Sequence, residues 1–284
     1  MIGPAEIGEA FLAACREEIE APKPGNVHIF GAGHGMTAED FLKSAEAASG
    51  PLSASGASVG ARVLTAIEAT RAAVGVNTNL GILLLCAPLA AAAERGGTDL
   101  EATLAGILKN LDRGDAEQVF RAIRLANPGG LGEVPRYDVR GPATVGLLEA
   151  MAEAAERDAV ASQYVSNFHD VFATGLEALE AARQCGLTPP LQAVAVYLRF
   201  LAAFPDTHIA RKFGPAAARG VQHEASEILL VFQTRKVDSL SDLLAFDERL
   251  KSRRRNPGTS ADLTVATLFA DRLRETLLQH RNDA

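Results

Sequence analysis

Two stretches of this 284-residue chain are apolar on every side when they are read as helices. Residues 80–93 read LGILLLCAPLAAAA, and residues 191–204 read LQAVAVYLRFLAAF, with Arg199 as the one charge. A helix without a polar face is usually central and buried. The chain therefore needs other helices to cover both stretches, and we expect the polar groups at their ends to lie in the interior or in a cleft.

Helical periodicity extends over most of the remaining chain, and no alternating segment is long enough to require a sheet. Alanine and leucine are abundant and aromatic residues make up only 5%, which favours close helix packing over a β-sandwich. We predict an all-α fold, a single compact multi-helix domain over residues 1–284 with buried central helices. The predicted helices are 5–20, 37–50, 55–73, 80–95, 98–111, 115–125, 142–157, 160–185, 189–204, 206–218, 221–235, 239–253 and 260–280.

The formal net charge of −7 argues against a general nucleic-acid surface, which needs a basic face. One basic run, residues 251–255, is interpreted first as a solvated helix end and second as an anion-binding patch. The start of the chain does not resemble a signal peptide, and the longest apolar runs, about 15 residues, are short for a bilayer. We expect a cytoplasmic protein without a membrane partner. Its alanine- and leucine-rich helix faces would suit a homodimer as well as a core.

Cys15, Cys86 and Cys185 are odd in number and far apart, so they match neither a zinc pattern nor a disulfide framework. Each lies in an apolar helical context. We expect buried free thiols.

The first loop that carries chemistry covers residues 20–36 and contains the tetrapeptide PKPG at residues 22–25. Two prolines make the backbone around Lys23 stiff and non-helical, so the ammonium can face a phosphate as a point charge. Glycines in the same loop let backbone amides approach a ligand closely, beside Asn26 and His34 as further contacts. The alternative is an ordinary connection with a solvated lysine.

The second loop, GVNTNLG at residues 75–81, precedes the first apolar helix. Thr78 or Asn79 can cap that helix, whose N-terminus is also a ready anion site, and Asn77 lies beside them. Simple capping is the alternative, although these polar groups need partners if they are buried.

The third loop, NPGGLGE at residues 127–133, ends in Glu133. Its carboxylate could bind a cation or a ribose hydroxyl. The alternative is a flexible surface turn.

The fourth loop, residues 205–212, follows the second apolar helix. A buried Asp206 needs a partner, and Arg211 and Lys212 follow it, which suits a metal-bridged polyphosphate with His208 as a further contact. The alternative is that Asp206 is a helix N-cap after Pro205.

The fifth loop, NPGTSAD at residues 256–262, offers Asn256 and Ser260 as groups that could line the same cleft. Its last residue, Asp262, could bind a metal ion. It could equally complete a capping box that begins at Thr259.

Taken together, the motifs in these loops resemble those of the triphosphoribosyl-dephospho-CoA synthase family. They occur in the same order as in that family, over residues 17–269. The resemblance implies an all-α transferase that joins ATP to 3'-dephospho-CoA, or a related cofactor precursor, through a ribosyl linkage and releases adenine. A transition state with oxocarbenium character requires carboxylates near the sugar and cations along the triphosphate. The resemblance implies that Glu17, Glu133 and Asp206 are catalytic and that Mg²⁺ is held by Asp206 and Asp262. The implied nucleotide-binding residues are Lys23, Asn26, His34, Asn77, Thr78, Asn79, His208, Arg211, Lys212, Asn256 and Ser260.

The chain departs from the family pattern where a His-Lys pair normally follows GVNT, because Asn79 and Leu80 stand there. Gly35 replaces an acid, and His208 replaces an asparagine. With these differences the chain resembles a divergent branch of the family, one associated with archaea and one-carbon metabolism. Two alternatives stay open: a nucleotide-binding homologue or one-carbon cofactor-biosynthesis protein with altered or no catalysis, and an ADP-ribosyl hydrolase, suggested by Asp206-Thr207.

Overall fold

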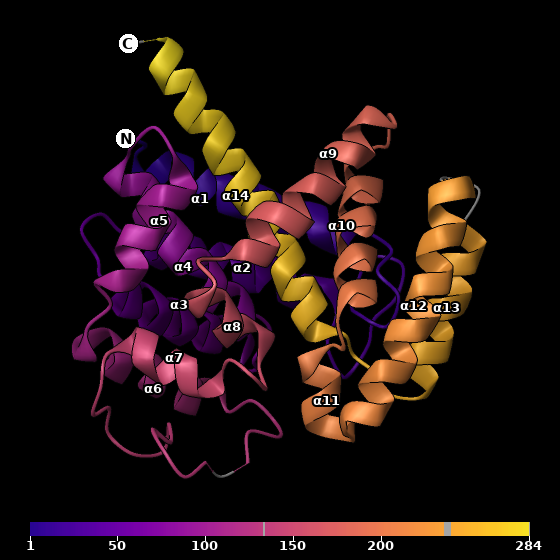
Figure 1. Cartoon of the computed structure of the whole chain (residues 1–284), viewed down its shortest axis with the longest axis horizontal. Coiled ribbons are helices and arrows are strands. Elements are labelled where there is room, and N and C mark those ends of the chain that lie inside the picture. Colours follow the sequence, from indigo (N-terminus) through magenta and orange to yellow (C-terminus); the bar gives the residue numbers. More distant parts are fainter. Residues whose placement is uncertain (133, 236–239, 284) are drawn as a thin grey trace. The chain divides into compact units, whose positions relative to one another are not determined.

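A computed structural model describes residues 1–132, 134–235 and 240–283 of the chain (Figure 1). Within these residues the regular structure is helical, apart from isolated bridges that pair His28 with Gly31 and Gly33 with Met36. The predicted all-α class is confirmed.

The contacts within the chain divide it into two units. Unit 1 contains Met1–Ala14, Lys43–His169 and Phe269–Ala284, and unit 2 contains Cys15–Leu42 and Asp170–Leu268. Three helices, α1 (Pro4–Glu20), α2 (Ala38–Ser53) and α14 (Gly258–Asn282), contribute residues to both units. Each unit is described by itself, and the single domain over residues 1–284 stays a prediction.

The first apolar stretch is the central helix of unit 1. It forms α4, which packs against α3, α5 and α8, and most of its side chains are buried. Burial of this helix confirms the prediction for residues 80–93. The helices that belong wholly to this unit are α3 (Val59–Val74), α4 (Leu80–Arg95), α5 (Leu100–Lys109), α6 (Arg113–Ala126), α7 (Leu147–Ala154) and α8 (Ala159–Val165).

Helices α3 and α6 approach closely at Gly60. A Cβ atom there would lie 2.6 Å from the Asp115 Cα and 2.7 Å from its carbonyl oxygen. Because backbone atoms cannot move aside as a side chain can, we expect Gly60→Ala to lower the free energy of unfolding by about 2 kcal/mol, measured by urea denaturation.

Gly106→Ala is the matched control, because no atom lies within 4 Å of a Cβ at this position on α5. It should stabilise the protein by up to about 1 kcal/mol through helix propensity. Equal effects of the two substitutions would contradict the close approach of α3 and α6.

The second apolar stretch is the central helix of unit 2. It forms α10, which packs against α9, α12 and the π-helical segment η1. Its buried side chains include Val194, Tyr197 and Phe200. Its Tyr197 hydroxyl donates a hydrogen bond to the Pro24 carbonyl oxygen at 2.6 Å, so the helix also supports the PKPG loop. The elements that belong wholly to this unit are η1 (Asp170–Gly175), α9 (Leu176–Gln184), α10 (Pro189–Ala203), α11 (Thr207–Phe213), α12 (Pro215–Arg235) and α13 (Leu240–Ser252).

Several predicted helices are wrong in their extent. The predicted helix 142–157 is limited to α7, Leu147–Ala154, and the predicted helix 221–235 begins six residues earlier, at Pro215. The predicted helix 160–185 is interrupted, because Asn167 and Phe168 adopt positive φ angles of 54° and 61° and the π-helical segment follows. The predicted helix 206–218 ends at Phe213, because Gly214 has a φ of 87° and Pro215 starts the next helix. Glycine tolerates that backbone region and proline suits the first helical position, so this pair separates α11 from α12.

All three cysteines are free thiols. Cys15 and Cys86 are buried as expected, but Cys185 is exposed, because it caps the C-terminal end of α9 instead of lying inside a buried helix.

Within the described ranges, no individual helix combines the length and apolar character needed to cross a membrane. The pair α4 and α5 meets those criteria only jointly, and it is bent by 111°.

Candidate functional site

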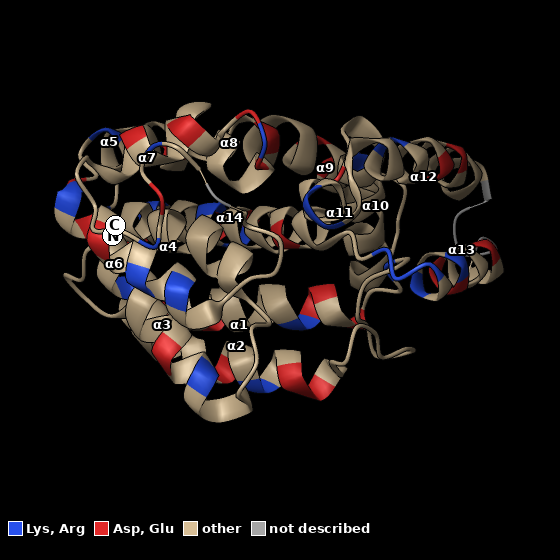
Figure 2. Ribbon diagram, turned by 90° about the horizontal axis from the view of Figure 1, so that it is seen from below, with Lys and Arg blue, Asp and Glu red and all other residues tan. Residues whose placement is uncertain are grey.

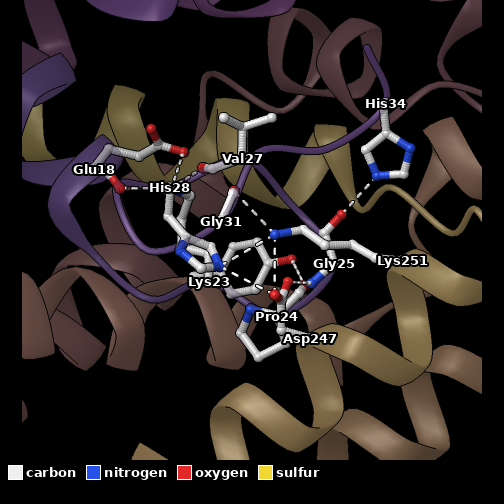
Figure 3. A network of polar contacts seen from close by, with 11 residues as sticks. Glu18, Lys23, Pro24, Gly25, Val27, His28, Gly31, His34, Asp247 and Lys251 are labelled. Carbon is white, nitrogen blue, oxygen red and sulfur yellow. Dashed lines mark hydrogen bonds and ion pairs between the residues drawn. The ribbon is translucent and has the colours of Figure 1, made fainter. Parts of the chain in front are cut away.

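The PKPG loop of unit 2 is folded around its own lysine (Figure 3). The Lys23 side chain is 0% exposed, and its ammonium donates to the carbonyl oxygens of Glu18 at 2.6 Å and Val27 at 2.9 Å. It also pairs with the Glu18 carboxylate at 3.1 Å, so all three donors are used. The predicted contact between Lys23 and phosphate would require these bonds to break. In this structure Lys23 instead holds the loop against the end of α1.

The buried pair of Lys23 and Glu18 is electrostatically costly to separate. Burial lowers the pKa of the Lys23 amine, and the negative charge of Glu18 opposes that shift. Burial raises the pKa of the Glu18 carboxyl, and Lys23 opposes that shift in turn. Each group therefore depends on the other to remain charged in the interior.

Helix α13 holds the loop from the other side through Asp247. One carboxylate oxygen accepts a hydrogen bond from the Gly25 amide at 2.8 Å. The other lies 3.0 Å from the Lys251 ammonium and 3.3 Å from His28 Nε2. Lys251 also donates to the Gly31 carbonyl oxygen at 3.1 Å, so the run predicted to be a solvated helix end begins with an engaged lysine. Burial alone would raise the pKa of Asp247, but these donors keep it below its usual value.

Gly25 is the point where three segments of unit 2 meet. Its φ of 81° lies in the left-handed region, and a Cβ there would lie 2.9 Å from the Arg255 carbonyl oxygen. Its own carbonyl oxygen lies 2.9 Å from His34 Nε2. The next residue, Asn26, donates from its side-chain amide to the Asn256 side chain at 2.8 Å. The loops predicted to share a cleft through Asn26, His34 and Asn256 are therefore in contact.

Asp206 joins the start of α11 to the start of α14. Its carboxylate is fully buried and accepts from the Ile209 amide at 3.1 Å, which makes it the N-cap of α11. Both the amide and the hydroxyl of Ser260 donate to the other carboxylate oxygen at 2.9 Å. The capping alternative for Asp206 is thus confirmed, and the same side chain satisfies a second helix N-terminus.

Stability should depend on the protonation of Asp206. Burial raises its pKa from 3.8 to about 6, although the amides of Ser260 and Ile209 act in the opposite direction. Because the folded state binds this proton more tightly, its contribution is fully present below pH 3.8 and lost as the pH rises through about 6. Relative to Asp206→Asn, we expect the free energy of unfolding to fall by roughly 3 kcal/mol across that window. Urea denaturation of both proteins at several pH values measures this, and a pH-independent difference would contradict it.

His208 lies on α11 against the start of α14, inside a group of basic residues. A Cβ on Gly258 would be 2.8 Å from its Nδ1 atom, and its Nε2 atom is buried without a hydrogen-bond partner among the described residues. Burial lowers the pKa of the imidazole to about 3, helped by Lys212, Arg211 and His34. The ring is therefore neutral at pH 7. A neutral imidazole beside three basic groups, all from unit 2, is suited to an anion.

The GVNTN residues lie in unit 1, where they support the start of α4. The Asn77 side chain accepts from the first amide of the helix at 3.2 Å. Thr78 donates to Ser44 at 2.6 Å, and Asn79 donates to Thr70 at 3.0 Å. Asn79 is the N-cap residue of α4, as predicted, but its side chain makes no capping hydrogen bond. The Thr78 and Asn79 side chains turn toward neighbouring helices, and Asn77 provides the bond instead. The side-chain Oδ1 atom of Asn79 is buried and has no hydrogen-bond partner in the described part of the chain.

The remaining predicted carboxylates are not brought into one cluster. Glu17 is buried on α1, Asp262 is on α14, and each is already engaged in an interaction. Glu133 lies outside the described residues. Residues 1–132, 134–235 and 240–283 contain no group of three or more His, Cys, Asp or Glu side chains suited to a metal ion. The Asp206 oxygens are occupied by amide and hydroxyl donors, so this conformation does not fit the predicted Mg²⁺ ligand at Asp206.

Comparison with known families decides what kind of protein carries this arrangement. The family model for ATP:dephospho-CoA triphosphoribosyl transferases matches residues 4–281. The chain belongs to this family. A protein of this family type from Archaeoglobus fulgidus, whose crystal structure is described as that of a candidate triphosphoribosyl-dephospho-CoA synthase, is similar in fold. It is 26% identical, with a TM-score of 0.64, and the match covers 81% of this chain and 96% of that one.

Membership in the triphosphoribosyl transferase family confirms the predicted family and transferase class. Neither comparison supports the hydrolase or the non-catalytic homologue over the transferase. The match extends over both units.

Sequence reasoning missed several residues that shape the site of this transferase. Asp247 and Lys251 fix the PKPG loop, and Glu18 neutralises its lysine. The spacing of Asp247 and Lys251, four residues apart on a predicted helix, was the available signal. No pattern in the sequence indicated that Arg255 would lie over Phe213.

Proposed function

We propose that this chain transfers the triphosphoribosyl group of ATP to a hydroxyl of 3'-dephospho-CoA, or of a related cofactor precursor, and releases adenine. The observation that supports this most directly is the surroundings of His208. Its buried Nε2 atom has no hydrogen-bond partner among the described residues, and three basic groups lie nearby. A triphosphate requires several cationic or hydrogen-bonding groups at close range. His208, His34, Arg211 and Lys212 would bind it in unit 2.

The chemistry places defined demands on the chain. The bond between the ATP ribose and adenine breaks, a bond to the acceptor oxygen forms, the acceptor hydroxyl loses a proton and adenine leaves with one. Basic groups along the triphosphate hold the donor in place while positive charge develops on the sugar. Asp206 acts as a positioning residue, since it ties α11, which carries His208, Arg211 and Lys212, to Ser260. Glu17 remains the proposed carboxylate for the sugar.

We also propose that Mg²⁺ binds together with the nucleotide. Mg²⁺ usually keeps several waters and is held by substrate phosphates with one or two carboxylates. Asp262 remains the proposed protein ligand, whereas the Asp206 oxygens already accept hydrogen bonds. ATP as the donor agrees with the cytoplasmic location expected from the sequence, and a homodimer stays a prediction.

Incubation of the protein with ATP, Mg²⁺ and 3'-dephospho-CoA tests the proposal. We expect free adenine by chromatography and an equal amount of the triphosphoribosyl adduct by mass spectrometry. If dephospho-CoA is inert, pterin- and furan-type cofactor precursors are the next acceptors. Release of no adenine with any of these acceptors would contradict the proposed reaction.

Lys212→Ala tests the position of the triphosphate. Removing one cation from the His208 group should raise the KM for ATP by about tenfold, since a charged hydrogen bond contributes roughly 1.5–3 kcal/mol. Lys109→Ala, an exposed lysine in the last turn of α5, is the control and should leave the KM unchanged. Equal KM values for the two variants would place the triphosphate elsewhere.

A further inference from the structure

The end of α11 carries an aromatic ring covered by a guanidinium. The Arg255 Cζ atom lies 3.9 Å from the centre of the Phe213 ring. Phe213 is nevertheless 40% exposed, which is high for a large apolar side chain at a helix end. Other members of the same basic run are paired with acids, Lys251 with Asp247 and Arg253 with Glu224. Arg255 is instead placed against a ring, an arrangement that keeps its planar group available for stacking.

The backbone that presents Arg255 is fixed by short-range hydrogen bonds. The Arg255 amide donates to the Leu250 carbonyl oxygen at 2.8 Å, and the Arg254 amide donates to that of Lys251 at 2.9 Å. Arg254 has a φ of 55°, so the chain leaves α13 through a left-handed turn. The Arg255 carbonyl oxygen then packs against Gly25. The guanidinium therefore extends from a firmly placed segment, and Figure 2 shows that the segment following α13 is basic.

The stack of Arg255 and Phe213 borders the basic group around His208. Helix α11 meets residues 255–258 in two places, with His208 against Gly258 and Phe213 under Arg255. His208 and Phe213 are five residues apart, about 7.5 Å along the helix axis. A single nucleotide can extend from one place to the other.

We propose that Arg255 and Phe213 form a platform on which the purine ring of ATP stacks while the His208 group binds its triphosphate. This inference rests on the proposed function and adds to it the recognition of the base. Aromatic rings and arginine planes both stack on nucleobases. Adenine is also the leaving group, so the platform would hold the base until its bond to ribose breaks.

Calorimetry with ATP and with inorganic tripolyphosphate separates the base from the phosphates. We expect the wild type to bind ATP more tightly than tripolyphosphate. Phe213→Leu removes the ring and keeps an apolar side chain, and Arg255→Lys keeps the charge and removes the plane. Each should weaken ATP binding at least fivefold and change tripolyphosphate binding by less than twofold. Unchanged tripolyphosphate binding also shows that the variants are folded.

Lys212→Ala is the contrasting variant, and it should weaken both ligands together. Equal losses for ATP and tripolyphosphate in Phe213→Leu and Arg255→Lys would overturn the platform, as would no loss for either ligand or equal affinities in the wild type. Failure of the transfer reaction is a separate outcome. If no adenine is released but the selective loss of ATP binding is observed, the platform stands and the proposed reaction falls.

Discussion

Replacing Lys23 with methionine is expected to lower the free energy of unfolding by about 4 kcal/mol, because it leaves a buried carboxylate without its partner. The lysine ammonium is fully buried against Glu18 and also donates to two carbonyl oxygens, so its removal takes a donor away from three acceptors. Methionine keeps much of the side-chain volume, which limits the effect of an empty cavity. Urea denaturation at neutral pH measures the change.

A double variant distinguishes the ion pair from general damage to the loop. Adding Glu18→Leu to Lys23→Met removes the stranded charge, so we expect it to recover about half of the lost stability. Recovery is incomplete because the carbonyl oxygens of Glu18 and Val27 still lack the hydrogen bond from the lysine. A double variant no more stable than Lys23→Met alone would show that the pair is not the source of the loss.

The second large effect is expected from Asp247, which fixes Gly25 and through it the residues that flank the proposed nucleotide site. We expect Asp247→Ala to lower kcat/KM for adenine release by about 100-fold, since a displacement of about 1 Å in a positioning element can have an effect of that size. Most of the change should be a higher KM for ATP, because the PKPG loop positions His34, one of the proposed phosphate contacts. This prediction rests on the proposed reaction.

Two further variants make the Asp247 result specific. Asp247→Asn keeps an acceptor for the Gly25 amide but loses the charge facing Lys251 and His28, so we expect an intermediate value. Glu248→Ala, at the next and exposed position of α13, should behave as the wild type does. A loss confined to thermal stability, with normal kinetics below the melting temperature, would make Asp247 a purely structural residue.

Much of the fold follows from the sequence because its apolar pattern shows which helices must be buried. Both helices that are apolar on all sides became the centres of their units, as α4 and α10. The interruption after Val165 was missed although Asn167 is a residue type that tolerates a positive φ angle, because the bulky Phe168, which also has a positive φ angle, does not indicate a break. Gly214 and Pro215, by contrast, were a visible breaking signal.

Part of the candidate site was predictable, since the loops that carry Asn26, His34 and Asn256 are in contact as expected, but the roles of individual residues were less so. A lysine between two prolines looks exposed in sequence, and only the fold shows that it turns back onto Glu18 and Val27. The two roles considered for Asp206, cap and metal ligand, could not be separated from local sequence. Ser260, 54 residues away, occupies one of its oxygens and favours the capping role.

The contacts of Gly25 connect the two groups of residues that are proposed to bind the nucleotide. Its amide is held by Asp247, its carbonyl oxygen by His34, and its α-carbon by the backbone of Arg255. One residue of the proposed base platform, Arg255, and one of the proposed phosphate group, His34, thus contact the same glycine. A substitution that displaces Gly25 is therefore expected to disturb the base platform through Arg255 and the phosphate group through His34 at the same time.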